Sequence, residues 1–372
     1  MLTLDDLRHF AVSQTLFTPT TLKRAIHKLG FVQADPIRAP ARAQDLMLRH
    51  RVKDYHNGDL ERRYAQLGVE EDAFVNYGFV TKSVQALMHP RASAGVPADG
   101  ERPWPASRNK QARLLLDFVA ERGSVHPREV DGHLSHHFSH GSVENYWGGS
   151  SNATTHLLDA MLYRGLLRVA RREGGIRIYA VHQHGLGPAS AAERRARVDA
   201  LADVAVRIYA PLPGSSLSFL VRRLRYAVPQ WRGELGSALQ RAKLRLSHTR
   251  LDGVDWYWPP DQGIVRRGTG DKVRLLTPFD PVVWDRPRFE ILWGWVYRFE
   301  AYTPAPKRKL GYYALPLLWR DRVIGWGNLS ITNGRLTPQF GYVDSRPPQD
   351  RAFNRELEAE IDRMQAFLGL SS

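Results

Sequence analysis

Apolar residues at helical spacing open the chain and predict a helical start. Thr3–Ala11 combines a capping box with one apolar face, and Leu22–Leu29 repeats the spacing up to Gly30, a residue suited to a left-handed helix end. Phe31–Asp35 then has the character of a short strand, and Ala41–Val52 that of a basic helix with an apolar stripe. Helix, helix, strand and helix is the order in which a winged-helix module begins.

A second stretch shows the same design more clearly. Gln111–Gly123 and Thr154–Arg164 have helical patterns, and a hairpin follows them. Its strands, Leu166–Arg171 and Ile176–Val181, alternate in polarity around Arg172–Gly175, which has the composition of a turn. Helices followed by a basic hairpin predict a second winged helix, with this hairpin as its wing.

A third copy is predicted from the order of elements, because no identical sequence repeat is visible. Helical patterns around Val198–Tyr209 and Ser215–Tyr226 precede the segment Trp231–Arg245. A turn at Asp252-Gly253 then leads into the aromatic strand Val254–Trp258.

From Val273 onward the pattern changes to strands. The predicted strands are Phe289–Ala301, Leu310–Leu318, Arg322–Thr332 and Arg335–Val343, with a hairpin turn at Asn333-Gly334. Gln349–Leu370 has one apolar stripe and is expected to be a helix that packs on the sheet.

These patterns predict an α+β chain with tandem winged-helix (helix-turn-helix) modules followed by a β-rich C-terminal domain closed by a helix. We expect winged-helix modules at residues 1–105, 106–190 and 191–265, and the β-rich domain at residues 266–372.

The charge balance points to a polyanionic partner. The 372 residues include 53 Lys and Arg against 38 Asp and Glu, a net charge of +15. Nucleic acid is the usual partner of such a chain, although charge that serves only solubility remains an alternative. The absence of cysteine excludes disulfides, thiolate catalysis and Cys-type metal sites. No signal-peptide pattern or membrane-length apolar run is visible, so we expect a soluble, cytoplasmic protein.

The candidate chemistry lies in the segment Gly30–Leu46. In an extended backbone, residues two apart face the same side, so Gln33 and Asp35 would point together into one cleft. Pro36 would end regular strand pairing at this point. A carboxylate in a low-dielectric pocket could stabilise a developing positive charge and activate water, and Gln33 could orient that water. Alternatively, Gln33 caps a neighbouring helix and Asp35 caps the turn at Pro36.

This segment resembles the Gln-aliphatic-Asp motif of winged-helix DNA glycosylases, the AlkZ/YcaQ-like family. Further similarity lies in Arg164-Gly165 before the predicted wing and in the aromatic, basic blocks Leu275–Arg288 and Tyr297–Leu318. The resemblance implies a monofunctional DNA glycosylase that hydrolyses the N-glycosidic bond of N7- or N3-alkylated, bulky or crosslinked purines in duplex DNA. It would act with Gln33 and Asp35 as catalytic residues, without cofactor or metal, as a monomer associated with the nucleoid.

Basic and aromatic residues near these motifs are candidates for binding DNA. The expected DNA-binding residues are Arg38, Arg42, Gln44, Arg49, Arg51, Arg171, Arg172, Arg177, Arg286, Arg288, Arg308 and Lys309. Candidate cleft residues are Asp280, Trp284, Tyr302 and Tyr312, for which core packing is the alternative.

Two departures from the family pattern support a competing hypothesis. Around Asn76–Phe79 the family tends to carry an acidic residue, a Trp and a His, and at the position of Trp326–Asn328 it more often has Arg and Asp. The competing hypothesis is a winged-helix DNA-binding or regulatory protein that performs no chemistry.

One histidine cluster is also visible, at His133, His136, His137 and His140. On a helix, His136 and His140 would share a face and could hold a metal. Without a paired carboxylate at ligand spacing, a solvent-exposed or DNA-facing cluster is the favoured interpretation.

Overall fold

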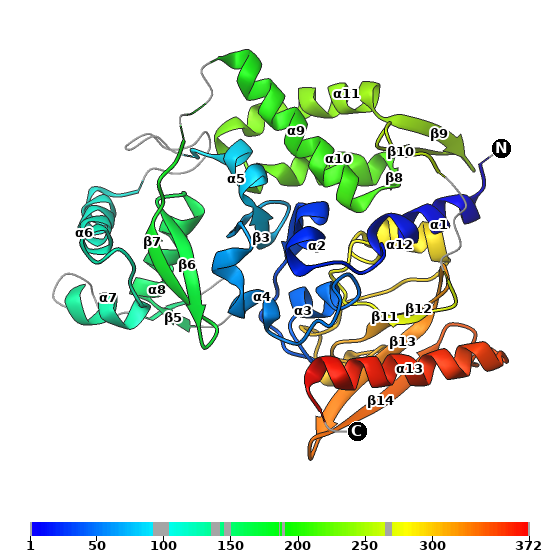
Figure 1. The fold of residues 1–372 in the computed structure, drawn as a ribbon. Coiled ribbons are helices and arrows are strands. Elements are labelled where there is room, and N and C mark those ends of the chain that lie inside the picture. The colour runs from blue at the N-terminus through cyan, green and yellow to red at the C-terminus, as the bar shows by residue number, and fades with distance from the viewer. Residues whose placement is uncertain are drawn as a thin grey trace. The chain divides into compact units, whose positions relative to one another are not determined.

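The computed structural model describes residues 2–91, 104–134, 142–144, 150–185, 187, 190–264 and 270–370. The chain divides into two compact units, each assembled from separate stretches of sequence. Unit 1 contains Met1–Asp59, Ala202–Val221 and Leu239–Ser372, and unit 2 contains Leu60–Leu201 and Arg222–Ala238. Helix and strand are mixed throughout, as expected for an α+β chain (Figure 1). No helix among the described residues has the length and apolar character needed to span a membrane.

The N-terminal elements of unit 1 follow local sequence signals closely. They are α1 (Leu4–Thr15), α2 (Leu22–Leu29), β1 (Phe31–Gln33) and α3 (Ala43–Leu48). The predicted capping box is confirmed, because the Thr3 side chain accepts from the Asp6 backbone and Asp6 accepts from the Thr3 backbone. Gly30 ends α2 at a φ of 75°, where glycine avoids the strain that a Cβ would cause.

The β-rich part of unit 1 is a four-stranded antiparallel sheet in the order β11-β12-β13-β14. Its strands are β11 (Val273–Leu275), β12 (Leu315–Trp319), β13 (Arg322–Thr332) and β14 (Arg335–Tyr342). The predicted turn at Asn333-Gly334 joins β13 to β14, with φ values of 52° and 74°. The closing helix α13 (Arg351–Leu368) lies against this sheet, and its Glu360 accepts from the Leu275 backbone at 2.9 Å (Figure 1).

One predicted strand, Phe289–Ala301, is wrong. The structure has helix α12 (Arg286–Trp293) there, followed by an irregular segment. Asp285 caps this helix by accepting from the Arg288 backbone, a proline stands in its first turn, and Gly294 ends it at a φ of 77°. These start and stop signals outweigh the apolar run that indicated a strand.

A smaller sheet in unit 1 has the order β8-β10-β9. It is formed by β8 (Leu212–Pro213), β9 (Ser247–Leu251) and β10 (Val254–Trp258), with the predicted turn at Asp252-Gly253 between the last two. The helices α4 (Asp59–Arg62), α9 (Ala191–Tyr209), α10 (Gly214–Arg223) and α11 (Leu235–Arg245) contain the points at which the chain passes between the units.

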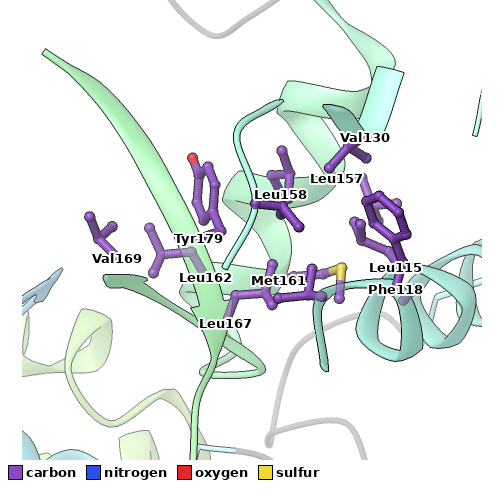
Figure 2. Packing of buried hydrophobic residues seen from close by; sticks show 13 residues of the cluster. Leu115, Phe118, Val130, Leu157, Leu158, Met161, Leu162, Leu167, Val169 and Tyr179 are labelled. Carbon is purple, nitrogen blue, oxygen red and sulfur yellow. The ribbon is translucent and has the colours of Figure 1, made fainter. Parts of the chain in front are cut away.

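Unit 2 contains three helices and a hairpin around one core. These are α6 (Ala106–Arg122), α7 (Pro127–Leu134), α8 (Ala153–Tyr163), β6 (Leu167–Glu173) and β7 (Ile176–Val181). Leu115, Leu158 and Val169 lie in the core that they share (Figure 2). The predicted hairpin is therefore confirmed, with its turn at Gly174-Gly175. The remaining elements are β2 (Val69–Ala73), β3 (Tyr77–Thr81), α5 (Lys82–Met88), β4 (Ser142–Glu144), β5 (Ser150–Asn152) and the short 3-10 helices Tyr64–Gln66, Leu224–Tyr226, Pro229–Glu234 and, in unit 1, Ala305–Lys307.

A run of buried carboxylates on β2 organises the charges of unit 2. Glu70, Glu71 and Asp72 are consecutive and buried. Glu70 pairs with Arg168 at 2.7 Å, Glu71 pairs with Arg172 at 2.6 Å, and Asp72 pairs with Arg91 at 2.6 Å. Each buried charge therefore has a partner of opposite sign, as burial requires.

In unit 1, a fully buried ion pair joins the N-terminal helices to the β-rich part. The Arg51 guanidinium donates to both carboxylate oxygens of Asp280, at 2.8 and 3.0 Å. It also donates to the backbone oxygens of Thr15 and Met47. This pair leaves neither charge unsatisfied.

Removing one partner of this pair should strongly destabilise the protein. We expect Arg51→Met to lower the free energy of unfolding by about 3–5 kcal/mol, because the Asp280 carboxylate would be left buried without its counter-ion. Urea unfolding followed by circular dichroism measures this loss. The matched control is Arg298→Met at an exposed position, which should change stability by less than about 0.5 kcal/mol. Equal effects in the two variants would contradict the assignment.

Candidate active site

Asp35 lies in a turn directly after β1, and two hydrogen bonds define its geometry. Its backbone N–H donates to Gln44 Oε1 at 3.3 Å, and its Oδ1 accepts from the Ile37 backbone N–H at 2.9 Å. β1 ends at Gln33, short of the predicted Asp35, since the Asp35 N–H is bonded to Gln44 and Pro36 has no N–H with which to pair. The sequence alternative in which Asp35 caps the Pro36 turn is therefore true of one carboxylate oxygen.

The second carboxylate oxygen of Asp35 is differently placed. Among the residues that the structure describes, Oδ2 has no hydrogen-bond partner, and no arginine or lysine pairs with this carboxylate. Despite the missing partner, the residue is buried, with only 9% of its surface exposed. Burial raises the pKa of Asp35 above its ordinary value, and the bond from Ile37 opposes this only in part.

The contrast with Asp72 shows what is unusual about Asp35. Asp72 is also buried, but the Arg91 guanidinium and the His89 ring hold its pKa well below the ordinary range against the effect of desolvation. Asp35 has desolvation without a compensating cation. A buried carboxyl group without a cation is less stable when ionised, and its pKa is raised. Such perturbed pKa values are typical of active-site residues.

Two tyrosines lie within the electrostatic reach of Asp35. Burial raises the pKa of Tyr313, and the negative charge of Asp35 adds to that effect. Tyr302 has its pKa raised by the same two causes, yet its side chain is 61% exposed. Phe299 supports both rings, at centroid distances of 5.3 Å from Tyr313 and 6.0 Å from Tyr302. The site thus combines a carboxylate with an exposed aromatic ring.

Two amides accompany the carboxylate. Gln33, the last residue of β1, is buried near the end of the strand that leads into the turn. Gln44, at the start of α3, is 2% exposed and uses its side-chain oxygen to hold the Asp35 backbone. Gln44 was predicted to contact DNA, but its burial gives it no surface for a phosphate, so we assign it to positioning the turn.

The other predicted DNA-binding residues fall into three groups by exposure. Exposed positions are Arg38, Arg171 and Lys309; partly exposed positions are Arg42, Arg49, Arg172, Arg177, Arg286 and Arg308; buried positions are Arg51 and Arg288. Arg51 is held by Asp280, and Arg288 donates to the backbone oxygens of Pro281, Val282 and Tyr209. Both side chains are buried and stabilise the interior of unit 1. The prediction that they contact DNA is therefore wrong.

Several partly exposed arginines also form ion pairs or hydrogen bonds with other residues of the protein. Arg49 pairs with Glu360, and Arg286 donates to the backbone oxygens of Val283 and Pro278. On the hairpin, Arg172 binds both oxygens of Glu71, and Arg177 pairs with Asp159 at 2.7 Å. Arg171 is 51% exposed and pairs with Glu173. The charge of this hairpin is therefore largely balanced inside unit 2.

The predicted cleft residues also differ in their exposure to solvent. Asp280 is fully buried against Arg51, so it is not a second cleft carboxylate. Trp284 packs against Tyr209 and Phe219, with ring centroids 4.7 and 6.1 Å away. Tyr312 is 45% exposed, and the Arg308 guanidinium lies over its ring at 5.0 Å.

The two departures from the family pattern have structural roles here. Asn76 accepts from Arg223 within unit 2. Asn328 donates to the Leu310 backbone at 2.7 Å, and a Cβ at Gly311 would collide with its side chain. Asn328 therefore fixes the segment that leads to Tyr312 and Tyr313.

Among the residues with described positions, no group of three possible metal ligands includes Asp35. In the described part of the chain, one group of three possible ligands occurs, and it consists of His89, His182 and His184 in unit 2. The cluster singled out in the sequence cannot be compared, because His136, His137 and His140 lie outside the described residues and the His133 side chain is not described.

Comparison with known proteins identifies similarity along nearly the whole chain. A family model described as DNA glycosylase AlkZ-like matches residues 26–367. Streptomyces sahachiroi DNA glycosylase AlkZ has a similar fold, with a TM-score of 0.64 at 14% sequence identity, over 100% of this chain and 98% of that one. At that identity the structural likeness shows the fold alone.

The environment of Asp35 predicts a stability effect that depends on pH. Because the folded-state pKa is raised, the stability associated with the protonated carboxyl is present at low pH and is lost as pH rises through the folded pKa. Asp35→Asn should therefore be more stable than the wild type at pH 7, and the difference should vanish below the ordinary pKa of 3.8. Urea unfolding across this pH range measures the difference.

Asp252→Asn is the control, since Asp252 is exposed in a turn at a φ of 47° that asparagine tolerates. It should show no such pH-dependent gain. If Asp35→Asn is less stable than the wild type at pH 7, the carboxylate serves the fold and the assignment is wrong.

Proposed function

The chain belongs to the AlkZ-like DNA glycosylase family, a family of DNA repair enzymes, and from this premise we propose that it hydrolyses the N-glycosidic bond of N7- or N3-alkylated purines in duplex DNA. Bulky and crosslinked adducts are included in the proposed substrate class. The observation that carries the proposal is the buried Asp35 carboxylate, whose Oδ2 has no partner among the described residues.

The proposed mechanism uses the two oxygens of Asp35 differently. The bond from Ile37 to Oδ1 fixes the orientation of the carboxylate, so that Oδ2 can face the reacting sugar. As the glycosidic bond breaks, positive charge develops on the sugar, and a nearby carboxylate in a poorly solvated site stabilises it strongly. The same oxygen accepts a proton from the water that attacks C1′, and Gln33 orients that water.

The proposed substrates explain why one carboxylate suffices. A purine alkylated at N7 or N3 already carries positive charge, so it leaves as a neutral base without a general acid. A lyase activity would instead need an amine nucleophile beside the sugar. Asp35 raises the pKa values of Tyr302 and Tyr313, and neither of these neighbours carries an amine, in keeping with a monofunctional enzyme.

The proposed DNA surface is smaller than the sequence suggests. Arg38 and Lys309 are exposed, Arg308 and Tyr312 form a half-exposed pair, and Tyr302 presents its ring to solvent beside Asp35. Exposed aromatic rings among basic side chains suit stacking on unpaired bases and contact with phosphates. The hairpin β6–β7 after α6–α8 has the element order of a winged helix, and we propose that role for it, with the enzyme acting as a monomer.

The decisive experiment measures base release under single turnover from a duplex that contains one N7-alkylguanine. Asp35→Asn should slow release by at least about a hundredfold, because the replacement keeps the hydrogen bond to Ile37 and removes the negative charge. The product strand should break only after alkaline treatment, as a monofunctional enzyme leaves an intact abasic strand.

Asp252→Asn is again the matched control and should release base at the wild-type rate. The glycosylase hypothesis fails if neither the wild type nor Asp35→Asn releases small or bulky adducts while both bind the duplex in a salt-sensitive manner. The hypothesis of a DNA-binding protein without chemistry then replaces it.

Phosphate contact at Arg38 gives a second prediction. Arg38 is exposed and makes no ion pair with any described residue, so Arg38→Ala should reduce the slope of log affinity against log salt concentration by about 1. Arg320→Ala removes an equal charge that Asp271 already balances at 2.7 Å, and it should leave the slope unchanged. Fluorescence anisotropy over a salt series measures both slopes. An unchanged slope for Arg38→Ala removes this residue from the DNA surface.

A further inference from the structure

Three histidines meet in unit 2, whereas Asp35 belongs to unit 1. His182 and His184 follow β7 two residues apart, and His89 follows α5. The ring centroids are 4.8 Å apart for His89 and His182, 4.9 Å for His89 and His184, and 4.0 Å for His182 and His184. One nitrogen from each ring lies within 4.8 Å of the other two.

The hydrogen bonds of this group leave ring lone pairs unused. His89 Nε2 faces Asp72 Oδ2 at 2.7 Å, and His184 Nε2 faces the Gly165 backbone oxygen. Both partners are oxygens that can only accept a hydrogen bond, so each ring donates from a protonated Nε2 and has a lone pair on Nδ1. Both Nδ1 atoms are buried and have no hydrogen-bond partner in the described structure, and His89 itself is 6% exposed.

This arrangement is the one found around metal-bound histidines. A ligating ring typically donates its other N–H to a carboxylate or a backbone carbonyl, which fixes the tautomer and the ring orientation. Asp72 supplies the carboxylate for His89, and Gly165 supplies the carbonyl for His184. An ordinary cluster of core histidines would leave two buried acceptors unsatisfied, which is unfavourable.

Local packing and charge also fit a bound cation. A Cβ at Gly165 would lie 2.7 Å from His89 Nδ1, so glycine is needed for the rings to approach this closely. Arg91 and Arg168 are balanced by Asp72 and Glu70. Burial lowers the pKa of all three imidazoles, that of His182 to about 3, and so favours the neutral form that binds metals.

We propose that His89, His182 and His184 bind a divalent transition-metal ion, with zinc the best match. Three imidazole nitrogens with no thiolate suit tetrahedral Zn²⁺, whose bonds of about 2.0–2.1 Å place ligand nitrogens about 3.4 Å apart. The present separations, of up to 4.8 Å, require the rings to rotate toward the ion when it binds. The fourth position opens to a cavity of about 650 Å³ lined by His182, His184, Lys82 and Arg197, so a water or an anionic group completes the shell.

The bound ion would link the end of β7 to the end of α5.

The test uses tag-free protein and the metal alone. Titration with Co²⁺ should give the absorption of one tetrahedral ion per chain, displaced by one equivalent of Zn²⁺, and zinc should raise the thermal unfolding midpoint. The double variant His182→Ala/His184→Ala should lose the absorption and the shift in midpoint, while circular dichroism at low temperature reports that it remains folded.

The second histidine cluster in the sequence provides the matched control. His136→Ala/His140→Ala removes the same number of imidazoles and should retain one tetrahedral ion per chain. Absence of stoichiometric binding by the wild type overturns the proposal. It is also overturned if the His136→Ala/His140→Ala variant loses the ion and the His182→Ala/His184→Ala variant keeps it.

Discussion

The fold of unit 1 depends on one buried ion pair, between Arg51 and Asp280. These residues are 229 positions apart, and both side chains are fully buried. The residues before Arg51 strengthen the same junction, because His50 bonds to the Leu275 backbone and Arg49 pairs with Glu360. The junction brings the turn that carries Asp35 into the unit that contains Tyr302 and Tyr313.

The candidate site differs from this ion pair, because its buried carboxylate, Asp35, has no counter-ion among the described residues. Arg51 and Asp280 neutralise each other, as Glu71 and Arg172 do in unit 2. Asp35 has burial and one orienting hydrogen bond, but no cation among the described residues. A buried carboxylate with a raised pKa and a single orienting hydrogen bond lowers the stability of the fold, and a protein tolerates such a loss where the ionised form takes part in chemistry.

Local sequence signals predicted the elements that local interactions stabilise. The capping box at Thr3, the left-handed Gly30 and the turn at Asn333-Gly334 are confirmed because neighbours in sequence determine them. Gln33 and Asp35 could be singled out as candidates because their spacing is local. Roles that depend on distant partners were not predictable: Arg51 and Gln44 look like DNA contacts beside the motif, yet Asp280 and the Asp35 backbone hold them in the interior.

In the proposed mechanism the ionised Asp35 carboxylate drives base release. The most direct test of this role is the pH dependence of single-turnover release by the wild type from an N7-alkylguanine duplex, because the permanently cationic base does not itself titrate in acid. We predict a rate that rises with pH through one ionisation, with an apparent pKa above 3.8, and then stays level. A rate that is independent of pH in this range, or the same ionisation in Asp35→Asn, would contradict the claim.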